Sequence, residues 1–455
     1  MELSVIILAA GKGTRMKSVL PKVMQPLAGK PLLAHVLATA QELQSSRTIV
    51  VYGHGGEVVQ KHFANQDNLA WALQAEQKGT GHAVQMALSQ LPETGKSLIL
   101  YGDVPLTTPE TLQKLLDLVV DNQKIALLTV NLANPTGYGR IVREAGLVQR
   151  IVEQKDASEQ EKQITEVNTG ILCVPNCHLH QWLPTLKNNN AQGEYYLTDV
   201  IALAVQQGLA VHTYQPQAAW EVEGINDKLQ LSTLERVYQR LQADNLMRAG
   251  ATIIDPARFD MRGTATIGMD VFFDANVLLE GDNHFGNGVK VGTNCVIKNC
   301  KIADGVEIRA NSVLEDAEIG QNAQIGPFAR IRPQSKIGAN VHIGNFVETK
   351  NTIMADGAKA NHLAYLGDSE VGERSNIGAG TITCNYDGAN KFKTIIGADA
   401  FIGSNSSLIA PVVIGDGATT GAGSAISKDV PTNHLAVARG IQRNIEGWNR
   451  PQKKK

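Results

Sequence analysis

What this sequence has little of argues against several classes of protein. Aromatic residues make up only 5% of its 455 residues, and 42 Lys and Arg nearly balance 44 Asp and Glu, which gives a formal net charge of -2. Such a chain offers no basic surface for nucleic acid or for an anionic membrane. The first apolar run, at residues 5–10, follows no basic segment and is far too short to cross a bilayer. We therefore expect small-molecule partners, with no nucleic acid and no membrane among them.

Cysteine is also scarce. The five cysteines are Cys173, Cys177, Cys295, Cys300 and Cys384. An odd number without an export signal predicts free thiols in the reducing cytoplasm. Two of them, Cys173 and Cys177, lie near His178 and His180, but the spacing matches no common zinc pattern. We favour a structural role for these four residues, with a metal site as the alternative.

Residues 1 to about 225 alternate between short apolar runs and amphipathic segments. Strands are predicted at 5–10, 48–52, 97–101 and 125–130, and helices at 31–43 and 109–120. This alternation predicts a Rossmann-like α/β domain with a mostly parallel sheet that is covered on both faces. Such sheets bind ligands at the carboxyl ends of their strands, so the loops after the strands are the places to look for chemistry.

After about residue 251 the pattern changes to a period of six. An aliphatic residue occupies nearly every sixth position: Ile319, Ile325, Ile331, Ile337 and Ile343, then Ile396, Ile402, Leu408, Ile414, Thr420 and Ile426. A small or branched residue follows four positions later: Ala323, Ala329, Ser335, Val341 and Val347, then Ala400, Ser406, Val412, Ala418, Ser424 and Val430. This period predicts a hexapeptide β-helix of stacked coils. It is irregular at 263–318 and 349–370, and irregular coils of a solenoid often carry function.

One long helix is predicted between the two regions, at 227–249. Leu234, Val237, Tyr238, Leu241 and Asn245 would share one face of it. We therefore expect an α/β domain at 1–226, a helical arm at 227–250 and a β-helix at 251–455.

The loop after the first strand combines glycine with positive charge. It is no Rossmann fingerprint, because Met16 stands where the third glycine belongs, and no Walker A loop, because no G-K-[ST] follows. Its two glycines let backbone N–H groups approach a ligand, and Lys12, Arg15 and Lys22 add charge, so the loop could cradle a triphosphate. A tight turn with solvated basic side chains is the alternative.

Three further elements of the first region could join that loop. Asp103 ends an apolar strand, where a carboxylate suits Mg²⁺ beside phosphates. Gln74, with the glycine-rich turn at 79–81, could read the edge of a base. Asn226 closes a short segment just before the long helix. Each element is weak by itself, and Asp103 could simply begin a loop.

In the second region, Arg332 stands in a slot that the neighbouring hexads fill with glycine. Lys350, Asn361, His362 and Tyr365 follow in the irregular stretch. Arg, Lys and Tyr on one solenoid face could bind a sugar phosphate. His362 has the side chain suited to a general base, although spacing alone favours a structural or solvated histidine.

Together and in this order, these elements resemble the sugar nucleotidyltransferases. With the β-helix added, essentially the whole chain resembles the bacterial family of bifunctional N-acetylglucosamine-1-phosphate uridyltransferases and glucosamine-1-phosphate acetyltransferases. The stretches that carry the resemblance include LAAGKGTRM, QAEQKGTGHA, YGDVPL, PTGYGRI, NTGIL, NNNAQGEYYLTD, IGPFARIRP, GNFVETK, NIGAGTITCNYDGANKFKT and EGW. It implies a left-handed β-helix and a transferase that uses acetyl-CoA, UTP and Mg²⁺ to make UDP-N-acetylglucosamine for peptidoglycan and lipopolysaccharide.

For the N-terminal region, the resemblance implies uridylyl transfer. Asp103 and Asn226 would hold Mg²⁺, and Arg15 and Lys22 would act on the phosphates in catalysis. UTP and the sugar would be bound by Leu8, Ala9, Ala10, Gly11, Lys22, Gln74, Gly79, Thr80, Tyr101, Gly102, Asp103, Gly139, Glu153, Asn168 and Asn226.

For the C-terminal region, the resemblance implies acetyl transfer, with His362 taking a proton from the glucosamine amine as it attacks acetyl-CoA. Glucosamine-1-phosphate would be bound by Arg332, Lys350, Tyr365 and Asn376, and acetyl-CoA by Ala379, Asn385, Tyr386, Ser404, Ala422 and Arg439. Members of this family are homotrimers with the acetyl site between subunits, and we expect the same of this chain, in the cytoplasm.

Two other interpretations of the layout stay open. A nucleotidyltransferase with a purely regulatory β-helix, as in ADP-glucose pyrophosphorylases, would leave His362, Lys350 and Tyr365 unexplained. A translation-factor subunit that serves as an exchange scaffold would not need Asp103 and Asn226 together with Lys22.

Overall fold

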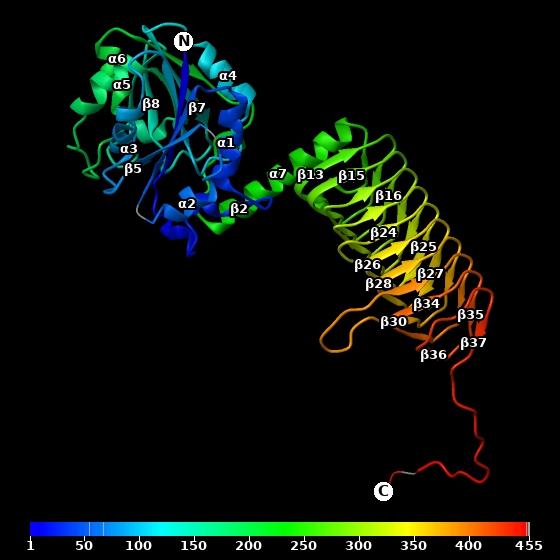
Figure 1. Ribbon diagram of the computed structural model, residues 1–455. Coiled ribbons are helices and arrows are strands. Elements are labelled where there is room, and N and C mark those ends of the chain that lie inside the picture. The colour runs from blue at the N-terminus through cyan, green and yellow to red at the C-terminus, as the bar shows by residue number, and fades with distance from the viewer. Residues whose placement is uncertain (54, 67, 452, 454–455) are drawn as a thin grey trace. The chain divides into compact units, whose positions relative to one another are not determined.

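The computed structural model describes residues 1–53, 55–66, 68–451 and 453. The chain forms two compact units, Met1–Tyr238 and Gln239–Lys455, and helix α7 (Lys228–Arg248) contributes to both. Figure 1 shows an α/β fold in the first unit and a column of stacked coils in the second. Within the described residues, no helix is both long and apolar enough to cross a membrane.

The first unit is built on one mixed sheet with the strand order β11-β7-β10-β6-β1-β4-β5, and the hairpin β8–β9 joins it at β10. Its strands are β1 (Leu3–Ala9), β4 (Arg47–Tyr52), β5 (Leu69–Leu73), β6 (Lys96–Tyr101), β7 (Lys124–Asn131), β8 (Arg140–Glu144), β9 (Leu147–Val152), β10 (Glu166–Pro175) and β11 (Ala210–Tyr214); β2 (Pro26–Leu27) and β3 (Lys30–Pro31) pair separately. The central strands β6, β1, β4 and β5 are parallel, whereas β10 is antiparallel to β6 and β7. The predicted α/β fold is therefore confirmed.

Helices cover both faces of this sheet. They are α1 (Leu32–Glu42), α2 (Glu57–His62), α3 (Thr80–Ala87), α4 (Pro109–Asp117), α5 (Asn176–Trp182) and α6 (Asp199–Gln206). Along β1, Ile6 and Leu8 pack into the core with α3, α5 and α6, while Val5 and Ile7 pack into the core with α1, α2 and α4. Successive strand residues point to opposite faces, so an unbroken apolar run marks a strand that is buried on both sides.

Helix α7 packs through different residues in its two halves. In its first half, Leu234 is fully buried, with Val237 and Tyr238 beside it, as predicted. In its second half, Ala243 and Leu246 enter the core, and Asn245 is exposed. The prediction of one continuous apolar face was wrong in this half, because the helix changes its packing partners along its length.

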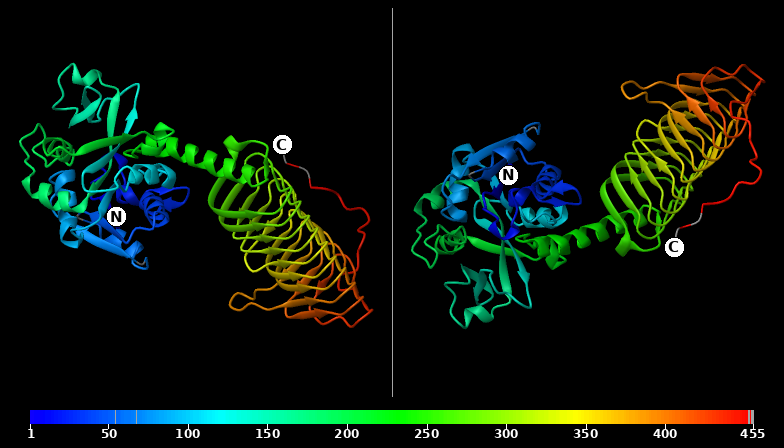
Figure 2. Two further views of the ribbon diagram at one scale, coloured as in Figure 1. Left: turned by 90° about the horizontal axis from the view of Figure 1, so that it is seen from above. Right: turned by 90° about the horizontal axis from the view of Figure 1, so that it is seen from below.

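The second unit is a left-handed parallel β-helix, whose coils follow one another along the column in Figure 2. Its strands are β12 (Thr252–Ile253), β13 (Asp260–Ile267), β14 (Phe272–Phe273), β15 (Leu278–Phe285), β16 (Lys290–Val291), β17 (Val296–Lys298), β18 (Lys301–Ile302), β19 (Glu307–Ile308), β20 (Val313–Glu315), β21 (Glu318–Ile319), β22 (Gln324–Ile325), β23 (Arg330–Ile331), β24 (Lys336–Ile337), β25 (His342–Asn345), β26 (Glu348–Met354), β27 (Lys359–His362), β28 (Tyr365–Val371), β29 (Asn376–Ile377), β30 (Ile382–Cys384), β31 (Thr394–Ile396), β32 (Phe401–Ile402), β33 (Ser407–Ile409), β34 (Val412–Ile414), β35 (Thr419–Thr420), β36 (Ala425–Ile426) and β37 (Leu435–Ala436).

The interior of the column is formed by the two repeating slots of the hexads. Every aliphatic and every small position predicted from the period of six is buried. Neighbouring coils pair in parallel, so that Ile308, Ile325 and Ile343 lie above one another. The hexapeptide prediction is confirmed, and its cause is a core built of stacked aliphatic side chains.

The corners between the sides of the column require left-handed backbone, which asparagine tolerates better than most residues. Asn276, Asn294 and Asn311 occupy one such corner in successive coils, with φ between 59 and 61°. Their side chains form a ladder, in which Asn276 donates to Asn294 at 2.9 Å and Asn294 donates to Asn311 at 3.1 Å. Phe328 and Phe346 continue the same corner at φ 55° and 57° with their rings stacked, 5.3 Å between centroids.

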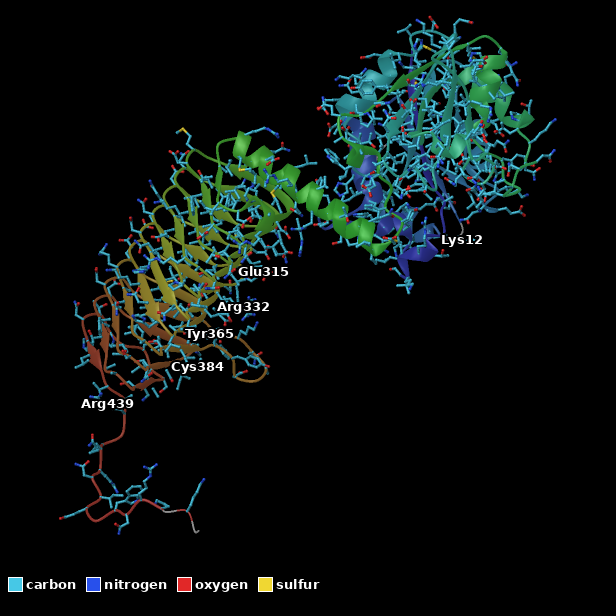
Figure 3. The ribbon with its side chains drawn as sticks, turned by 180° about the vertical axis from the view of Figure 1, so that it is seen from behind. Lys12, Glu315, Arg332, Tyr365, Cys384 and Arg439 are labelled. Atoms are coloured by element: carbon cyan, nitrogen blue, oxygen red, sulfur yellow. The ribbon has the colours of Figure 1, made fainter. Side chains whose placement is uncertain are left out.

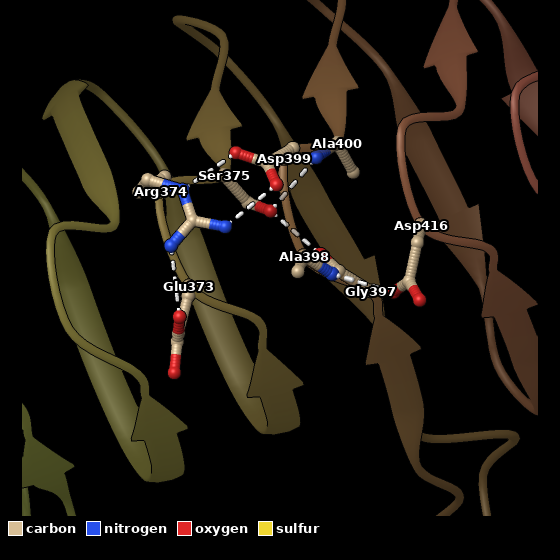
Figure 4. A network of polar contacts seen from close by, with 8 residues as sticks. All are labelled: Glu373, Arg374, Ser375, Gly397, Ala398, Asp399, Ala400 and Asp416. Carbon is tan, nitrogen blue, oxygen red and sulfur yellow. Dashed lines mark hydrogen bonds and ion pairs between the residues drawn. The ribbon is translucent and has the colours of Figure 1, made fainter.

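Ion pairs join coils at another corner (Figure 4). The guanidinium of Arg374 donates to both carboxylate oxygens of Asp399, at 2.8 and 2.7 Å, and to Glu373 at 2.8 Å. Asp416 accepts from the backbone N–H of Ala398 at 2.8 Å. The Asp399 carboxylate has a lowered pKa because Arg374 donates to it.

The irregular stretches of the hexad pattern keep the corners of the column but contain coils that are one residue shorter. Strand β28 pairs with both β30 and β31 and includes the corner residue Asp368, which has a φ of 47°. Gln324 pairs with His342, 18 positions on, whereas His342 pairs with Lys359, 17 positions on. Losing one residue shifts the phase of the hexads while the coils continue to stack.

The β-helix core generates a stability prediction for strand β21. Ile319→Ala should lower the free energy of unfolding by roughly 2–5 kcal/mol, because it leaves a cavity in the aliphatic column. Glu318→Ala, one residue away on the exposed side, should cost about 0.5 kcal/mol or less. Chemical denaturation measures both, and hydrogen exchange should accelerate in β18 and β24 in the first variant only. Equal effects of the two substitutions would contradict this account of the column.

Candidate active sites

A pocket of about 330 Å³ lies at the carboxyl ends of β1 and β6 in the first unit. Ten residues predicted to bind the nucleotide line it: Leu8, Ala9, Ala10, Gly11, Lys22, Gln74, Gly79, Thr80, Tyr101 and Asp103. Arg15, Gly102, Gly139, Glu153, Asn168 and Asn226 are outside its lining. The pocket thus gathers residues that are up to 186 positions apart in the chain, from Leu8 to Glu194.

The loop at 11–16 owes its shape to one glycine. Gly13 has a φ of 60°, and a Cβ there would lie 2.6 Å from Cβ of Lys22. The turn thereby lets Lys22 approach the loop from behind and reach the pocket. Lys12 and Arg15 are exposed, and neither lines the pocket; Figure 3 labels Lys12.

A cluster of one cation and two oxygen-bearing side chains lies at one end of the pocket. The ammonium of Lys22 forms an ion pair with Asp103 and donates to Oδ1 of Asn226 at 3.1 Å. The backbone N–H of Ile225 donates to the carbonyl of Asp103 at 2.9 Å, which ties the segment at 221–226 to the loop after β6. The Lys22 and Asp103 side chains are each only 13% exposed. A carboxylate and an amide oxygen that already hold a cation between them are chemically suited to a divalent metal.

The other end of the pocket holds an oriented amide. Nε2 of Gln74 donates to the carbonyl of Gly79 at 3.0 Å and lies 3.1 Å from Nδ1 of His82. Gly79 has a φ of 104° just before α3, and its carbonyl can therefore turn toward Gln74. The hydroxyl of Thr80 accepts from the backbone N–H of Leu197 at 3.1 Å.

Glu153, Gly139 and Asn168 lie together near Tyr101. The backbone N–H of Asn168 donates to the carbonyl of Gly139 at 2.8 Å, and a Cβ on Gly139 would lie 3.4 Å from the Glu153 carboxylate. Burial raises the pKa of Glu153, and a hydrogen bond from Thr198 opposes that shift. Burial likewise raises the pKa of the Tyr101 phenol, and the Glu153 charge adds to it. A half-buried carboxylate beside this pocket is suited to accepting hydrogen bonds from sugar hydroxyl groups.

Sequence reasoning missed several residues of this pocket. Gln77 and Glu194 line it, and the Gln77 amide donates to the carbonyl of Ala10. His82 lies behind Gln74 and outside the lining. All three fall within stretches that resemble the family, QAEQKGTGHA and NNNAQGEYYLTD, so the signal was present but was not assigned to single side chains.

In the second unit, two predicted residues lie in one column of the β-helix, on the side labelled in Figure 3. The pairing of β20, β23, β26, β28 and β30 places Glu315, Arg332, Lys350, Gly367 and Cys384 at equivalent positions of successive coils. Tyr365 starts β28 in the adjacent column. A Cβ on Gly367 would lie 2.4 Å from the Tyr365 hydroxyl oxygen, so the Tyr365 ring covers the position of this glycine.

This column concentrates positive charge. Nη1 of Arg332 is 2.7 Å from Oε1 of Glu348, and this contact raises the pKa of the guanidinium. The ammonium of Lys391 lies beside that of Lys350 and lowers the pKa of Lys350, with burial acting in the same direction and Asp368 opposing. Two ammonium groups side by side form a site that an anion would stabilise. Lys391 was not among the predicted residues, because it comes from the insertion at 385–393.

His362 ends β27 at the corner of the column and is exposed. Its Nδ1 is 3.0 Å from Oδ1 of Asn345, the residue paired with it in the previous coil. An amide oxygen accepts, so Nδ1 carries the proton and the lone pair is on Nε2. Asn345 is therefore a residue that sequence reasoning missed, although GNFVETK contains it.

The predicted acetyl-CoA residues continue from His362 along the same corner. Ala379, Ser404 and Ala422 each lie two positions beyond a strand residue that pairs with the equivalent residue of its neighbour. Arg439 donates to the carbonyl of Ala422 at 2.8 Å. Asn376 begins β29 on the adjoining side.

Asn385 and Tyr386 open the insertion at 385–393, which stands out from the column between β30 and β31 (Figure 1). The Asn385 side chain is buried and donates to Asp368, while Tyr386 is 61% exposed. The insertion thus begins with an anchored residue and then leaves the column.

Two other features do not form sites. Among the described residues, no group of three or more His, Cys, Asp or Glu could hold a metal. His178 instead stacks on Trp182, and His180 bonds to the Leu91 carbonyl at 3.0 Å. A hollow of about 890 Å³ on the β-helix is larger than the 330 Å³ pocket of the first unit. It is mostly lined by aliphatic residues and glycine and contains none of the predicted site residues.

Comparisons with known proteins agree with this arrangement. Residues 5–162 match the MobA-like NTP transferase domain, and residues 316–351 and 393–428 match the bacterial transferase hexapeptide (six repeats). The chain is 60% identical to the "Bifunctional protein GlmU" of Acinetobacter baylyi and 59% identical to that of Acinetobacter baumannii, with 100% of each chain covered. A solved structure of UDP-glucose pyrophosphorylase complexed with UDP-glucose covers 52% of this chain and 98% of its own, with 18% identity and a TM-score of 0.43, and this likeness supports no inference.

Full-length identity at this level, together with both domain matches, establishes the family. The chain therefore belongs to the GlmU family, and it is a bifunctional enzyme that joins a uridyltransferase to an acetyltransferase.

Proposed function

We propose that residues 251–455 acetylate glucosamine-1-phosphate and that residues 1–226 then couple the product to UTP, giving UDP-N-acetylglucosamine and pyrophosphate, with residues 227–250 as the connecting arm. The observation that supports the uridylyl step is the ammonium group of Lys22, which lies between Asp103 and Asn226 at one end of the pocket. The paired ammonium groups of Lys350 and Lys391, in the column next to the His362 corner, support the acetyl step. Scarce, scattered thiols that are free in the structure agree with a cytoplasmic enzyme.

For the uridylyl step, Mg²⁺ would be held by Asp103 and Asn226, whose oxygens fit it, and would neutralise phosphate charge. The backbone of residues 8–11 would contact the nucleotide, and Gln74 would read the uracil. The sugar phosphate attacks the α-phosphorus in line, and pyrophosphate leaves. Lys22 would stabilise the charge that builds up, and Arg15, which is exposed, would reach the outer phosphates.

The sugar of this step would be bound beside the nucleotide. Gly139, Asn168 and the half-buried carboxylate of Glu153 lie next to Tyr101, which lines the nucleotide pocket. Glu153 can accept from sugar hydroxyl groups, and Gly102 leaves room for the side chains of Val23 and Ala9, which a Cβ would meet at 3.1 and 3.3 Å. Positioning of two anionic reactants is the main work of these residues.

For the acetyl step, His362 would be the general base. The glucosamine nitrogen attacks the thioester carbonyl carbon, its proton moves to Nε2 of His362, the C–S bond breaks, and the CoA sulfur leaves and takes a proton. Asn345 holds the ring with Nδ1–H bonded, which leaves Nε2 free to accept. Ser404 or a backbone N–H would donate to the oxyanion. Arg332, Lys350, Tyr365 and Asn376 would bind the sugar phosphate.

Acetyl-CoA would lie along the corner that carries Ala379, Ser404 and Ala422, with Arg439 at its far end and Asn385 and Tyr386 at the insertion. Ala379, Ser404 and Ala422 are small residues at equivalent positions of successive coils, in line with His362. An extended cofactor would follow this row of residues through several coils.

We further propose that the chain works as a homotrimer. Three apolar side chains at the corner of His362 are unusually exposed: Phe328 at 48%, Phe346 at 54% and Leu363 at 64%. All three occupy the left-handed corner position of successive coils, so their side chains follow one another along one edge of the column. An exposed apolar edge beside the proposed acetyl site suits burial against a different surface of a neighbouring subunit, and three such contacts close a ring.

Asp103→Asn should abolish most uridylyl transfer and spare acetyl transfer. Asn keeps the shape but loses the charge that holds the metal, so kcat should fall on the order of 10²-fold or more. Mn²⁺ binding, followed by electron paramagnetic resonance with UTP present, should weaken in parallel. Asp117→Asn, on the exposed side of α4, is the matched control. If both activities of a folded Asp103→Asn protein decline together, Asp103 is structural.

His362→Ala should cripple acetyl transfer and leave uridylyl transfer intact. The loss should fall on kcat, on the order of 10²–10⁴-fold, because a positioned base is removed. Lys350→Ala should instead raise KM for glucosamine-1-phosphate. His284→Ala, an exposed histidine elsewhere on the β-helix, is the control. A folded His362→Ala enzyme with normal acetyl-transfer kcat would favour a purely regulatory β-helix.

Sedimentation equilibrium should give three times the chain mass. Joint substitution of Phe328→Asp and Phe346→Asp should produce smaller species and remove acetyl transfer, because charge replaces the apolar contact near His362. Uridylyl transfer should survive. Leu147→Asp replaces a similarly exposed apolar residue of the first unit and should leave the assembly unchanged. An active monomer would rule the assembly out.

A further inference from the structure

The side-chain amide of Gln74 has only one orientation that satisfies its neighbours. Its terminal nitrogen is 3.0 Å from the carbonyl oxygen of Gly79, and a carbonyl oxygen can only accept. The end of the amide that faces Gly79 is therefore the NH₂ group. Only 3% of Gln74 is exposed, so water has little access to this hydrogen bond. The other end of the amide is therefore the oxygen atom, Oε1.

His82 completes the set of acceptors for that nitrogen. It lies on α3, outside the pocket lining, with Nδ1 at 3.1 Å from Nε2 of Gln74. Because both hydrogens of the amide are used, one by Gly79 and one by His82, Nδ1 must present a lone pair, and the neutral ring carries its proton on Nε2.

The surroundings of His82 keep the ring neutral. Burial lowers the pKa of His82 first, and the ammonium of Lys78 adds to this. A backbone hydrogen bond to Glu76 and the Glu76 carboxylate oppose the shift. The ring of Tyr195 lies 6.4 Å away between centroids. At neutral pH the lone pair on Nδ1 is therefore available to Gln74.

The oxygen of the Gln74 amide is thereby left for a ligand. Among residues 1–53, 55–66, 68–451 and 453, none donates a hydrogen bond to Oε1, and Gln74 lines the pocket. An amide oxygen at this place accepts a hydrogen bond. Uracil presents a donor, N3–H, on its pairing edge, whereas cytosine presents an acceptor at N3. An oxygen that is fixed opposite N3 thus accepts from uracil, whereas it faces a lone pair in cytosine.

We propose that His82 is a positioning residue which locks the Gln74 amide with its oxygen toward the base and thereby makes the pocket select uridine over cytidine nucleotides. The proposal rests on the uridylyl transfer proposed above. Without His82, one N–H of Gln74 loses its acceptor, and only the single hydrogen bond to Gly79 opposes rotation of the amide. His82 acts through Gln74 and does not touch the nucleotide.

Two substitutions at one position separate positioning from simple packing. His82→Leu keeps bulk and removes the acceptor. His82→Asn restores an acceptor, because Oδ1 of asparagine is attached to Cγ as Nδ1 is in histidine. Steady-state kinetics with N-acetylglucosamine-1-phosphate and either UTP or CTP give kcat and KM for each variant. Acetyl transfer and the melting transition report on folding.

One neutral hydrogen bond corresponds to about a three- to tenfold effect. We expect His82→Leu to raise KM for UTP by about that factor with little change in kcat, and to lower the preference for UTP over CTP in kcat/KM by about tenfold or less. His82→Asn should recover most of the preference. An unchanged preference in a folded His82→Leu enzyme would overturn the proposal, as would an Asn variant no better than the Leu variant.

Gln74→Leu distinguishes failure of this inference from failure of the function beneath it. If Gln74→Leu lowers the preference and His82→Leu does not, His82 has no positioning role, and the nucleotide site stands. If Gln74→Leu also leaves the preference unchanged, Gln74 does not read the base, and the proposed placement of the nucleotide is wrong. Loss of preference in Gln74→Leu and His82→Leu, with recovery in His82→Asn, supports the positioning role of His82 and the proposed placement of the nucleotide.

Discussion

The parallel main-chain hydrogen bonds between successive coils fix nearly everything in the second unit. They place residues 17 or 18 positions apart next to one another, so Arg332, Lys350 and Gly367 form one column although they are far apart in the chain. The buried aliphatic slots keep the coils in that register, since a shift by one residue would turn the column of Ile side chains outward. The proposed acetyl site is a consequence of this register rather than of any local fold.

The first unit depends on a different constraint, the common edge at which its central parallel strands end. β1 and β6 deliver the glycine loop and Asp103 to the same pocket, and the segment before α7 returns Asn226 to it through the bond between Ile225 and Asp103. The ammonium group of Lys22 balances the charge of the Asp103 carboxylate there. Under the proposed function, the two ends of the pocket would receive different parts of the substrates, with a metal and phosphates at one end and a base at the other.

Much of this was predictable from the sequence, for identifiable reasons. The period of six predicts stacked coils, so the burial of all the hexad positions could be foreseen. Short apolar runs between amphipathic segments predicted the α/β unit. Positions such as Asn345, Lys391 and His82 could not be assigned, because their roles depend on contacts across coils or across the sheet that no local pattern encodes. Helix α7 shows the same limit. The predicted apolar face is correct in the first half of the helix. It is wrong in the second half, where Asn245 is exposed and Ala243 enters another core.

The coil-by-coil construction of the β-helix also bears on how such a protein can change over evolution. Each coil contacts only its neighbours, and the proposed acetyl residues begin at Arg332, several coils after β12. Coils between β14 and β19 could therefore be gained or lost as whole units without altering the spacing of the site. The number of coils can therefore change without disturbing the stacking, whereas the loss of one residue within a coil, as between His342 and Lys359, shifts the phase of the hexads. Such a fold tolerates change in steps of one full turn.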